Sequence, residues 1–309
     1  MFQLSKLLVI CYIICYSYAS TKNKPHDHSG VLTQYDGKHI PYSIDKLQLD
    51  KLNKGEPVVI KETSGKAGTG TVIQDVHAPP EICFERIADL DNYYKVVPKV
   101  KSVKVYRESK YDNGTVNLGA EFTVGISLLT FGYFINLTKE PKYNTIYWVL
   151  DYAHTSDFDD NVGHWQVLPH PNKEGWSRVL YSTGVKLYPW IPNFIVTFLT
   201  NTALVESTTW VKKESEKYAL EAKKTGSSPS FKSGLPDVSK CFHEDENGAS
   251  YDISCSLEEV KEAPVVTEEE SSNEATQVDS LVEDTEIIET KDTIENADSN
   301  NEIGNDSEL

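Results

Sequence analysis

The sequence predicts an α+β domain in which a curled antiparallel sheet wraps around one long C-terminal helix. Between Val116 and Ile126, the segment "TVNLGAEFTVGIS" alternates apolar and polar residues, which is the pattern of a half-buried antiparallel strand. The helical segment that begins at Pro192 is the one long enough to cover the apolar face of such a sheet. Because a twisted sheet of this size curls, we expect a space between the sheet and the helix.

Two short helices are predicted directly after the first strand of the domain, Thr71–His77. Pro79 and Pro80 mark a helix start, and Glu81 lies in its first turn. A second short helical turn is expected over residues 89–94, before Pro98. The apolar face of the first helix is formed by Ile82, Phe84, Ile87 and Leu90.

At least five antiparallel strands follow, separated by the turn-forming segments "DNG", "EPKYN" and "HPNKEG". Their alternating apolar residues are Val103 and Val105, Val116 to Ile126, Phe131 to Leu137, Ile146 to Tyr152, Trp165 and Val167, and Val179 to Leu187. The last helix, about 28 residues and ~42 Å long, should present one face made of Phe194, Phe198, Asn201, Val205 and Thr209.

The ends of the chain differ in composition from the middle. Residues 1–19 have the short apolar run and small residues of a secretory signal peptide, and residues 20–54 are polar. The chain carries a net charge of −17, of which residues 241–309 supply −20, so the first 240 residues carry +3. We therefore predict a ligand-binding domain at 55–222 and a disordered acidic tail at 223–309.

A signal peptide indicates secretion or the lumen of an endomembrane compartment, with import into a plastid through that route as the alternative. Three sequons agree with a lumenal location, and they predict glycosylation at Asn113, Asn136 and Asn305. Cys241 and Cys255 either pair in a disulfide or remain free thiols. Cys83 is expected to be a buried apolar group.

No catalytic, metal or cofactor site is predicted. Asp157, Asp159 and Asp160 lie near His164, but strand alternation turns His164 away from the interior, and the aspartates suit a turn better than a cation site or a catalytic site. His26 and His28 form an isolated His-x-His pair, which by itself assigns no metal. Known nucleotide and hydrolase motifs are missing from the sequence, and its charge has the wrong sign for nucleic acid.

Aromatic side chains gather on the predicted inner face of the sheet and helix. Together they favour a ligand cavity over a filled core, and Tyr and Trp keep a polar atom that can orient a headgroup. The predicted ligand-pocket residues are Phe122, Phe131, Tyr133, Trp148, Tyr152, Trp165, Tyr181 and Phe198.

Three stretches resemble the polyketide cyclase/dehydrase and coenzyme Q-binding branch of the START-like (SRPBCC) superfamily. They are "APPEICFERIADLDNYYKVVPKVKSVKV", "GHWQVLPHPNKEGWSRVLYS" and "YPWIPNFIVTFL". The resemblance covers about residues 70–220 and implies the helix-grip fold with a deep hydrophobic cavity. It implies no single reaction, since this fold hosts both carriers and enzymes.

The predicted function is therefore non-catalytic binding or transport of a lipid, isoprenoid or quinone, sterol or polyketide-like molecule by a monomer. A cyclase-type enzyme with an aromatic substrate in the same pocket is the first alternative, and an interaction module with an acidic tail is the second. Trp190 and Ile191 lie between prolines, where exposed apolar side chains would allow transient membrane contact.

Overall fold

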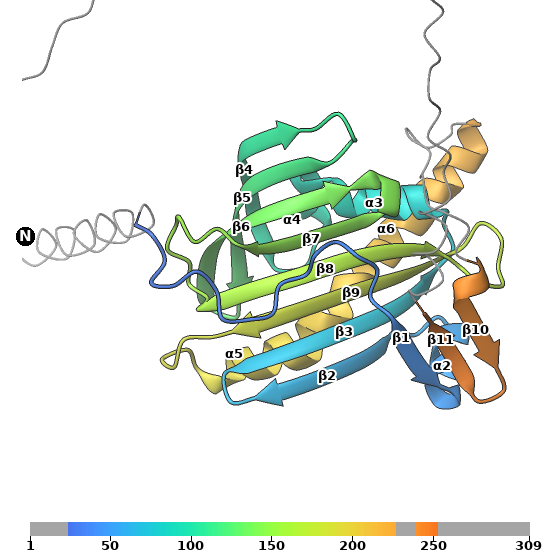
Figure 1. The fold of residues 1–309 in the computed structure, drawn as a ribbon, viewed down its shortest axis with the longest axis horizontal. Helices are drawn as coiled ribbons and strands as arrows, with labels where there is room; N and C mark the ends of the chain where they lie inside the picture. Colours follow the sequence, from blue (N-terminus) through green and yellow to red (C-terminus); the bar gives the residue numbers. More distant parts are fainter. Residues whose placement is uncertain (1–23, 227–238, 253–309) are drawn as a thin grey trace, which may run out of the picture. The chain divides into compact units, whose positions relative to one another are not determined.

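The main sheet has eight antiparallel strands in the order β2-β3-β9-β8-β7-β6-β5-β4 (Figure 1). In this computed structural model, the described residues are 24–226 and 239–252. The strands are β2 (Val58–Ser64), β3 (Ala67–Val76), β4 (Val100–Lys110), β5 (Val116–Ile126), β6 (Leu129–Glu140), β7 (Thr145–Leu150), β8 (Asp160–Pro169) and β9 (Ser177–Lys186).

Short helices connect β3 to β4, and one long helical segment follows β9. The first group is α3 (Pro80–Ala88), the 3-10 turn η1 (Leu90–Asn92) and α4 (Tyr93–Val96), and a second 3-10 turn, η2 (Pro141–Tyr143), joins β6 to β7. The long segment consists of α5 (Asn193–Phe198), the π-helical turn η3 (Leu199–Ala203) and α6 (Leu204–Thr225). In Figure 1, α6 crosses one face of the sheet, where it packs against β3, β9 and α3. This arrangement is the helix-grip fold, and it confirms the predicted fold class.

The predicted face of the long helix is wrong except at Phe198, which is half-buried. Phe194, Asn201, Val205 and Thr209 are exposed, whereas Ile195, Leu204 and Trp210 are buried. The buried face is already displaced by one residue at Ile195, and the π-helical turn then inserts an extra residue into the helical repeat and rotates every later side chain around the helix axis. The buried positions of α6 are Leu204, Thr208, Trp210, Val211, Ser215 and Ala219.

The N-terminal strap, residues 25–41 of the segment predicted to be polar, lies against the outer face of the sheet. Its backbone is fixed by carboxylate and amide groups of β8. The amides of Val31 and Leu32 donate to one carboxylate oxygen of Asp160 at 2.7 and 2.8 Å, and the Ile40 amide donates to Gln166 Oε1 at 2.5 Å. In Figure 1 the strap runs along β8.

A second, three-stranded sheet corrects the expectation that the whole of 223–309 is disordered. Its order is β1-β11-β10, formed by β1 (Tyr42–Asp45), β11 (Gly248–Tyr251) and β10 (Phe242–Asp245), with a 3-10 turn η4 (Ser239–Cys241) before β10. Helix α2 (Lys46–Asn53) follows β1 and begins with a capping box in which Asp45 and Gln48 bond each other's backbone amides. Residues 242–251 fold because β1 supplies a pairing partner and Tyr251 is buried beside Leu52 in a shared apolar cluster.

The cysteines and the glycosylation sequons differ in how exposed they are. Cys83 is buried as a free thiol. Cys241 is disulfide-bonded, but Cys255 lies outside the described residues, so the pairing of the two stays a prediction. Asn113 is exposed in the β4–β5 turn, and Asn136 is half-buried on β6, where Arg107 donates to its side chain. Asn305 and the predicted signal peptide also lie outside the described residues.

No helix among residues 24–226 and 239–252 is long and apolar enough to cross a membrane.

A buried ion pair within the main sheet is also hydrogen-bonded to the second sheet. Arg178 on β9 is 1% exposed, and its Nε and Nη2 donate to the two carboxylate oxygens of Asp75 on β3 at 2.7 and 3.0 Å. Arg178 Nη1 also donates to the hydroxyl of Tyr42 on β1, and His170 Nε2 lies 3.0 Å from Asp75. Burial alone would raise the pKa of Asp75, but the hydrogen bonds from His170 and Arg178 and the charge of Arg178 lower it to about 2.

This pair predicts a stability loss in acid. Because the folded pKa of Asp75 is below its unfolded value, the pair stabilises the protein above about pH 4, and about 2 kcal/mol is lost as the pH falls from 4 to 2. Arg178→Met should lower the free energy of unfolding at pH 6 by roughly 3–5 kcal/mol, since it leaves a buried carboxylate without its cation. Urea unfolding at several pH values measures both effects. The assignment is wrong if Arg178→Met keeps the wild-type pH dependence between 4 and 2.

Candidate functional site

A cavity of about 220 Å³ lies between the inner face of the sheet and the long helical segment. Its walls come from β5 to β9, from α4 and the start of β4, and from the stretch that includes η3 and the first turns of α6. Among the lining residues only Pro98 and Lys99 are fully exposed. The opening therefore lies between the α4–β4 connection and the π-helical turn.

Strand alternation brings most of the predicted pocket residues to this cavity. Inward-facing positions on paired strands meet across the sheet, so that Trp148 and Trp165 both pack against the ring of Tyr181, with centroid distances of 5.9 and 4.4 Å. Phe122 stacks on Tyr133 with ring centroids 5.3 Å apart. The predicted residues that line the cavity are Phe122, Tyr133, Trp148, Trp165, Tyr181 and Phe198.

Two predicted pocket residues do not line the cavity. Phe131 faces inward but lies beyond its end, where its ring stacks on Phe158 in a separate buried cluster. Tyr152 follows the last residue of β7, Leu150, so strand alternation no longer sets its direction. Its hydroxyl instead donates to Asp160 at 2.8 Å, beside the N-terminal strap.

Several lining residues were not predicted from the sequence. Tyr93 comes from a single turn of helix, too short to show an apolar face, and its hydroxyl donates to the Ile87 carbonyl at 2.5 Å. Trp210 faces the cavity because of the π-helical turn described above. Asn161 is a polar residue on the inner face, and its Oδ1 accepts a 2.6 Å hydrogen bond from Trp148 Nε1. A polar residue at an inward position of β8 was the available signal for it.

The cavity combines apolar walls with a few polar groups. Burial raises the pKa of the Tyr133 hydroxyl, and burial raises that of Tyr181 to about 12, against a hydrogen bond with Thr183 that lowers it. Both hydroxyls therefore stay protonated near neutral pH and can donate to a ligand. The charged side chains that line the cavity, Lys99 and Glu206, are at least partly exposed, so the inner part can hold an uncharged ligand.

His164 does not belong to this cavity. As strand alternation predicts, it points to the opposite face from Trp165, but the N-terminal strap covers it, so that it is fully buried and its ring stacks on Tyr35. Burial lowers its pKa to about 3, so the imidazole is neutral at physiological pH. It is therefore not positioned as an acid or base toward a ligand in the cavity.

Of the three aspartates at the start of β8, Asp157 and Asp160 accept hydrogen bonds from backbone amides of other segments, and Asp159 pairs with a lysine. Asp160 holds the strap, and Asp157 Oδ2 accepts from the Gly132 amide at 2.6 Å. Asp159 Oδ2 lies 2.7 Å from Lys186 Nζ. These contacts agree with the structural interpretation of the acidic cluster, although the amides of Asp160 and Asp157 come from distant segments and not from the local turn.

Comparison with protein families identifies the segment that builds this cavity. Residues 76–206 match the family model described as "Polyketide cyclase / dehydrase and lipid transport". The match covers nearly the stretch on which the sequence resemblance rests, and the hydrophobic cavity lies within the fold expected for it.

Solved structures similar to this chain cover about half of it. A START superfamily protein from Mycobacterium smegmatis has 15% identity and a TM-score of 0.40, over 52% of this chain and 98% of its own. The Zhui aromatase/cyclase from Streptomyces sp. R1128 has 13% identity and a TM-score of 0.42, over 56% and 100%. An 18 kDa protein from Caulobacter crescentus has 18% identity and a TM-score of 0.40, over 52% and 99%. No curated protein matches the chain significantly.

The indole of Trp148, which lines the cavity, lies directly over Gly163 and leaves no room for a side chain there. These residues pair directly across β7 and β8, and a Cβ at position 163 would lie 1.8 Å from Trp148 Cζ2. Gly163→Ala should displace the indole, break its bond to Asn161 and lower the free energy of unfolding by about 1–3 kcal/mol. Chemical denaturation and near-UV circular dichroism measure these changes.

The second-site change Trp148→Leu is the matched control, because it removes the ring that the new methyl group would strike. In the double variant, Gly163→Ala should be less destabilising than it is beside Trp148. Simple additivity of the two changes would contradict the proposed contact.

Proposed function

We propose that this protein binds a hydrophobic small molecule in the cavity and carries it without transforming it. The observation behind the proposal is the composition of the walls: aromatic and aliphatic side chains surround the cavity, hydroxyl and amide groups supply a few polar contacts, and the charged lining residues are not buried. Apolar ligand surface that leaves water contributes roughly 25 cal/mol per Å², while the polar groups orient the ligand.

The size of the cavity narrows the ligand class. Its volume of about 220 Å³ is below the roughly 300–1,000 Å³ typical of sites for drug-sized molecules. It suits a small aromatic ring system, or one segment of an acyl, prenyl or sterol-type molecule whose remainder leaves between Lys99 and the π-helical turn. Tyr133 and Tyr181 favour a ligand with a hydrogen-bond acceptor, such as a carbonyl or quinone oxygen.

A cyclase-type enzyme is the second candidate, favoured by the family description and by the tyrosines in the cavity. General acid–base catalysis works best when the catalytic group has a pKa near the working pH. Burial raises the pKa of Tyr181 to about 12, and His164 lies on the other face of the sheet. These two facts favour a ligand carrier over a cyclase-type enzyme.

A cavity-filling substitution tests the binding proposal. Val185 lines the cavity on β9, and a tryptophan there suits a strand while occupying the space of the ligand. For Val185→Trp we expect at least a tenfold loss of ligand, whereas Lys104→Trp, on an exposed position of β4, should bind normally. The measurement is native mass spectrometry of residues 20–309 from a eukaryotic secretory host, followed by solvent extraction of the bound molecule.

The fate of the bound molecule distinguishes a carrier, an enzyme and an interaction module. An apolar adduct that is released chemically unchanged after incubation supports a carrier, and conversion of the extracted molecule by fresh protein supports the enzyme. If the wild type shows no adduct and binds nothing from a panel of lipids, quinones and aromatic polyketides, both ligand-binding candidates fail and the interaction module remains.

We also propose that one end of the domain touches membranes while the ligand enters or leaves. The tip of the β5–β6 turn exposes Leu128, which is 98% accessible, and the β9–α5 connection exposes Trp190, which is 66% accessible. Buried residues that flank the two segments, Ile126 and Ile191, belong to the same apolar cluster. The two exposed side chains are therefore held at the same end of the domain.

This membrane contact predicts a specific loss of vesicle binding. Leu128→Glu together with Trp190→Glu should reduce cosedimentation with phosphatidylcholine–phosphatidylserine vesicles by at least tenfold, because charge opposes insertion of both tips. Leu47→Glu, on a leucine of α2 that is 74% accessible, is the control and should bind as the wild type. Equal binding of all three proteins would refute the contact.

We propose that the protein functions as a monomer in the secretory or endomembrane lumen. The predicted signal peptide and the sequons at Asn113, Asn136 and Asn305 support this location. The disulfide-bonded Cys241 adds support, since disulfides persist in oxidising compartments.

A further inference from the structure

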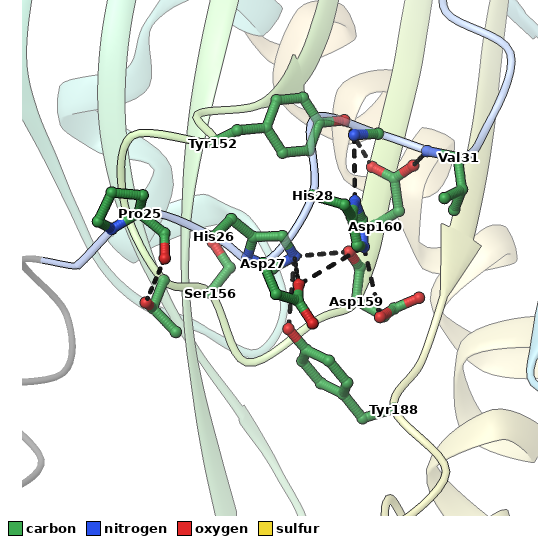
Figure 2. Close-up of polar contacts among 12 residues, drawn as sticks. Pro25, His26, Asp27, His28, Val31, Tyr152, Ser156, Asp159, Asp160 and Tyr188 are labelled. Atoms are coloured by element: carbon green, nitrogen blue, oxygen red, sulfur yellow. Dashed lines mark hydrogen bonds and ion pairs between the residues drawn. The ribbon is translucent and has the colours of Figure 1, made fainter. Parts of the chain in front are cut away.

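The start of the N-terminal strap brings a His-Asp-His sequence to the turn before β8. The backbone amide of His26 donates to the Tyr152 carbonyl at 2.9 Å, and Thr155 Oγ1 donates to the Lys24 carbonyl at 2.9 Å. These bonds place His26, Asp27 and His28 beside Asp159, more than 130 residues later in the chain (Figure 2).

Three side-chain ligand atoms converge there, and a carboxylate oxygen of Asp159 lies next to one of them. Asp27 Oδ1 lies 3.5 Å from His26 Nε2 and 3.8 Å from His28 Nε2, and Asp159 Oδ1 lies 3.5 Å from His28 Nε2. The ligand atoms of His26, Asp27 and His28 are all within 4.8 Å of one another. Ligands held about 2.0–2.2 Å from a tetrahedral zinc ion are separated by about 3.3–3.6 Å. The three printed pairs, at 3.5, 3.8 and 3.5 Å, are close to this spacing, and the atoms that lie up to 4.8 Å apart would have to move closer to enclose one ion.

We propose that His26, Asp27, His28 and Asp159 form a binding site for one divalent transition-metal ion of the zinc class. Two imidazoles and two carboxylates suit zinc, copper or nickel, whereas calcium and magnesium prefer shells made of oxygen atoms. The site is distinct from the cavity, and none of its four residues lines the cavity.

The burial of His26 supports this assignment. Its side chain is 0% exposed, yet its Nδ1 has no hydrogen-bond partner among the described residues. Its Nε2 contacts the Asp159 carbonyl at 2.8 Å, so hydrogen bonds within the described residues satisfy only one of the two ring nitrogens. Asp27 is 68% exposed at its side chain, which leaves the site accessible to an ion from solvent.

Neighbouring groups orient the carboxylates. Lys186 Nζ lies 2.7 Å from Asp159 Oδ2, which leaves Oδ1 facing His28. The positive charge of Lys186 opposes a cation, but the two proposed carboxylate ligands outnumber it. Asp160 is engaged with the amides of Val31 and Leu32 and so holds the strap in place next to the site.

Metal binding requires protons to move within this cluster. His28 Nδ1 accepts a hydrogen bond from the Gly30 amide at 3.1 Å, so the proton of the neutral ring is on Nε2. An ion bound at Nε2 displaces that proton, places one on Nδ1 and turns the Gly30 amide away. His26 Nε2 likewise exchanges its 2.8 Å contact with the Asp159 carbonyl for the ion. The loss of these two neutral hydrogen bonds lowers affinity by roughly tenfold each, which the two new metal–nitrogen bonds must offset.

The location gives the ion a structural role. The Tyr188 hydroxyl lies 3.4 Å from His26 Nε2, and the Tyr188 ring stacks on Trp190 in the connection that leads to α5. An ion at this site would link the beginning of the strap to the turn before β8, next to the connection that exposes Trp190.

Zinc and cobalt titrations test the proposal with the mature chain, residues 20–309, carrying no affinity tag. We expect one zinc per chain by competition with a chromophoric chelator, and cobalt should give the intense visible absorption of a tetrahedral complex. His28→Gln should weaken zinc binding by at least a hundredfold and Asp27→Asn by about tenfold, the second at an exposed position where folding is not at risk. His243→Gln, on an exposed histidine of β10, is the control and should bind as the wild type.

The proposal is overturned if the wild type binds zinc no more tightly than His28→Gln while both are folded by circular dichroism. It is equally overturned if Asp27→Asn leaves the affinity unchanged or if the cobalt spectrum is that of an octahedral complex. Because the site is separate from the cavity, retention of the hydrophobic ligand by His28→Gln would leave the carrier proposal untouched.

Discussion

The burial of Arg178 is the constraint on which the arrangement of the two sheets depends. A guanidinium group cannot be desolvated without partners, and here they come from separate parts of the chain: Asp75 on β3, Tyr42 on β1 and Glu244 on β10, whose carboxylate is 4.0 Å away. Arg178 therefore links the main sheet to β1 and β10, which lie before and after the residues matched by the family model. These contacts add to the β1–β11 pairing and to the apolar cluster around Tyr251 in holding residues 239–252.

The two faces of the main sheet are closed in different ways, and this difference determines where a ligand can bind. On the inner face a helix bridges a curled sheet, so that the middle of the contact stays open as a cavity. On the outer face the N-terminal strap lies flat on β8 and bonds to its polar side chains. Strand β8 is consequently buried on both sides almost throughout. The polar side chains on its outer face, such as Asp160 and Gln166, hold the backbone of the strap.

The polar groups at the junctions between segments differ from those in the cavity. Groups with strong electrostatic partners, such as Asp75 and Asp160, lie at junctions between segments. Those in the cavity, Tyr133, Tyr181 and Asn161, are neutral and suited to orienting an uncharged ligand. Among the lining residues, the carboxylate and the ammonium group, those of Glu206 and Lys99, lie at least partly exposed and not in the interior of the cavity.

The sequence by itself determined the helix-grip architecture and most of the cavity wall, because strand alternation shows directly which side chains share a face. That alternation placed Trp165 inside and His164 outside, and both assignments are correct. Only the tertiary structure decided what covers each face. The strap has no periodic pattern, β1 and β11 are four residues each and more than 200 residues apart in the chain, and a π-helical turn rotated α6. Local periodicity shows that a face is apolar, but it does not show which distant segment covers that face. Long-range packing decides this, and it also decides that His28 lies next to Asp159.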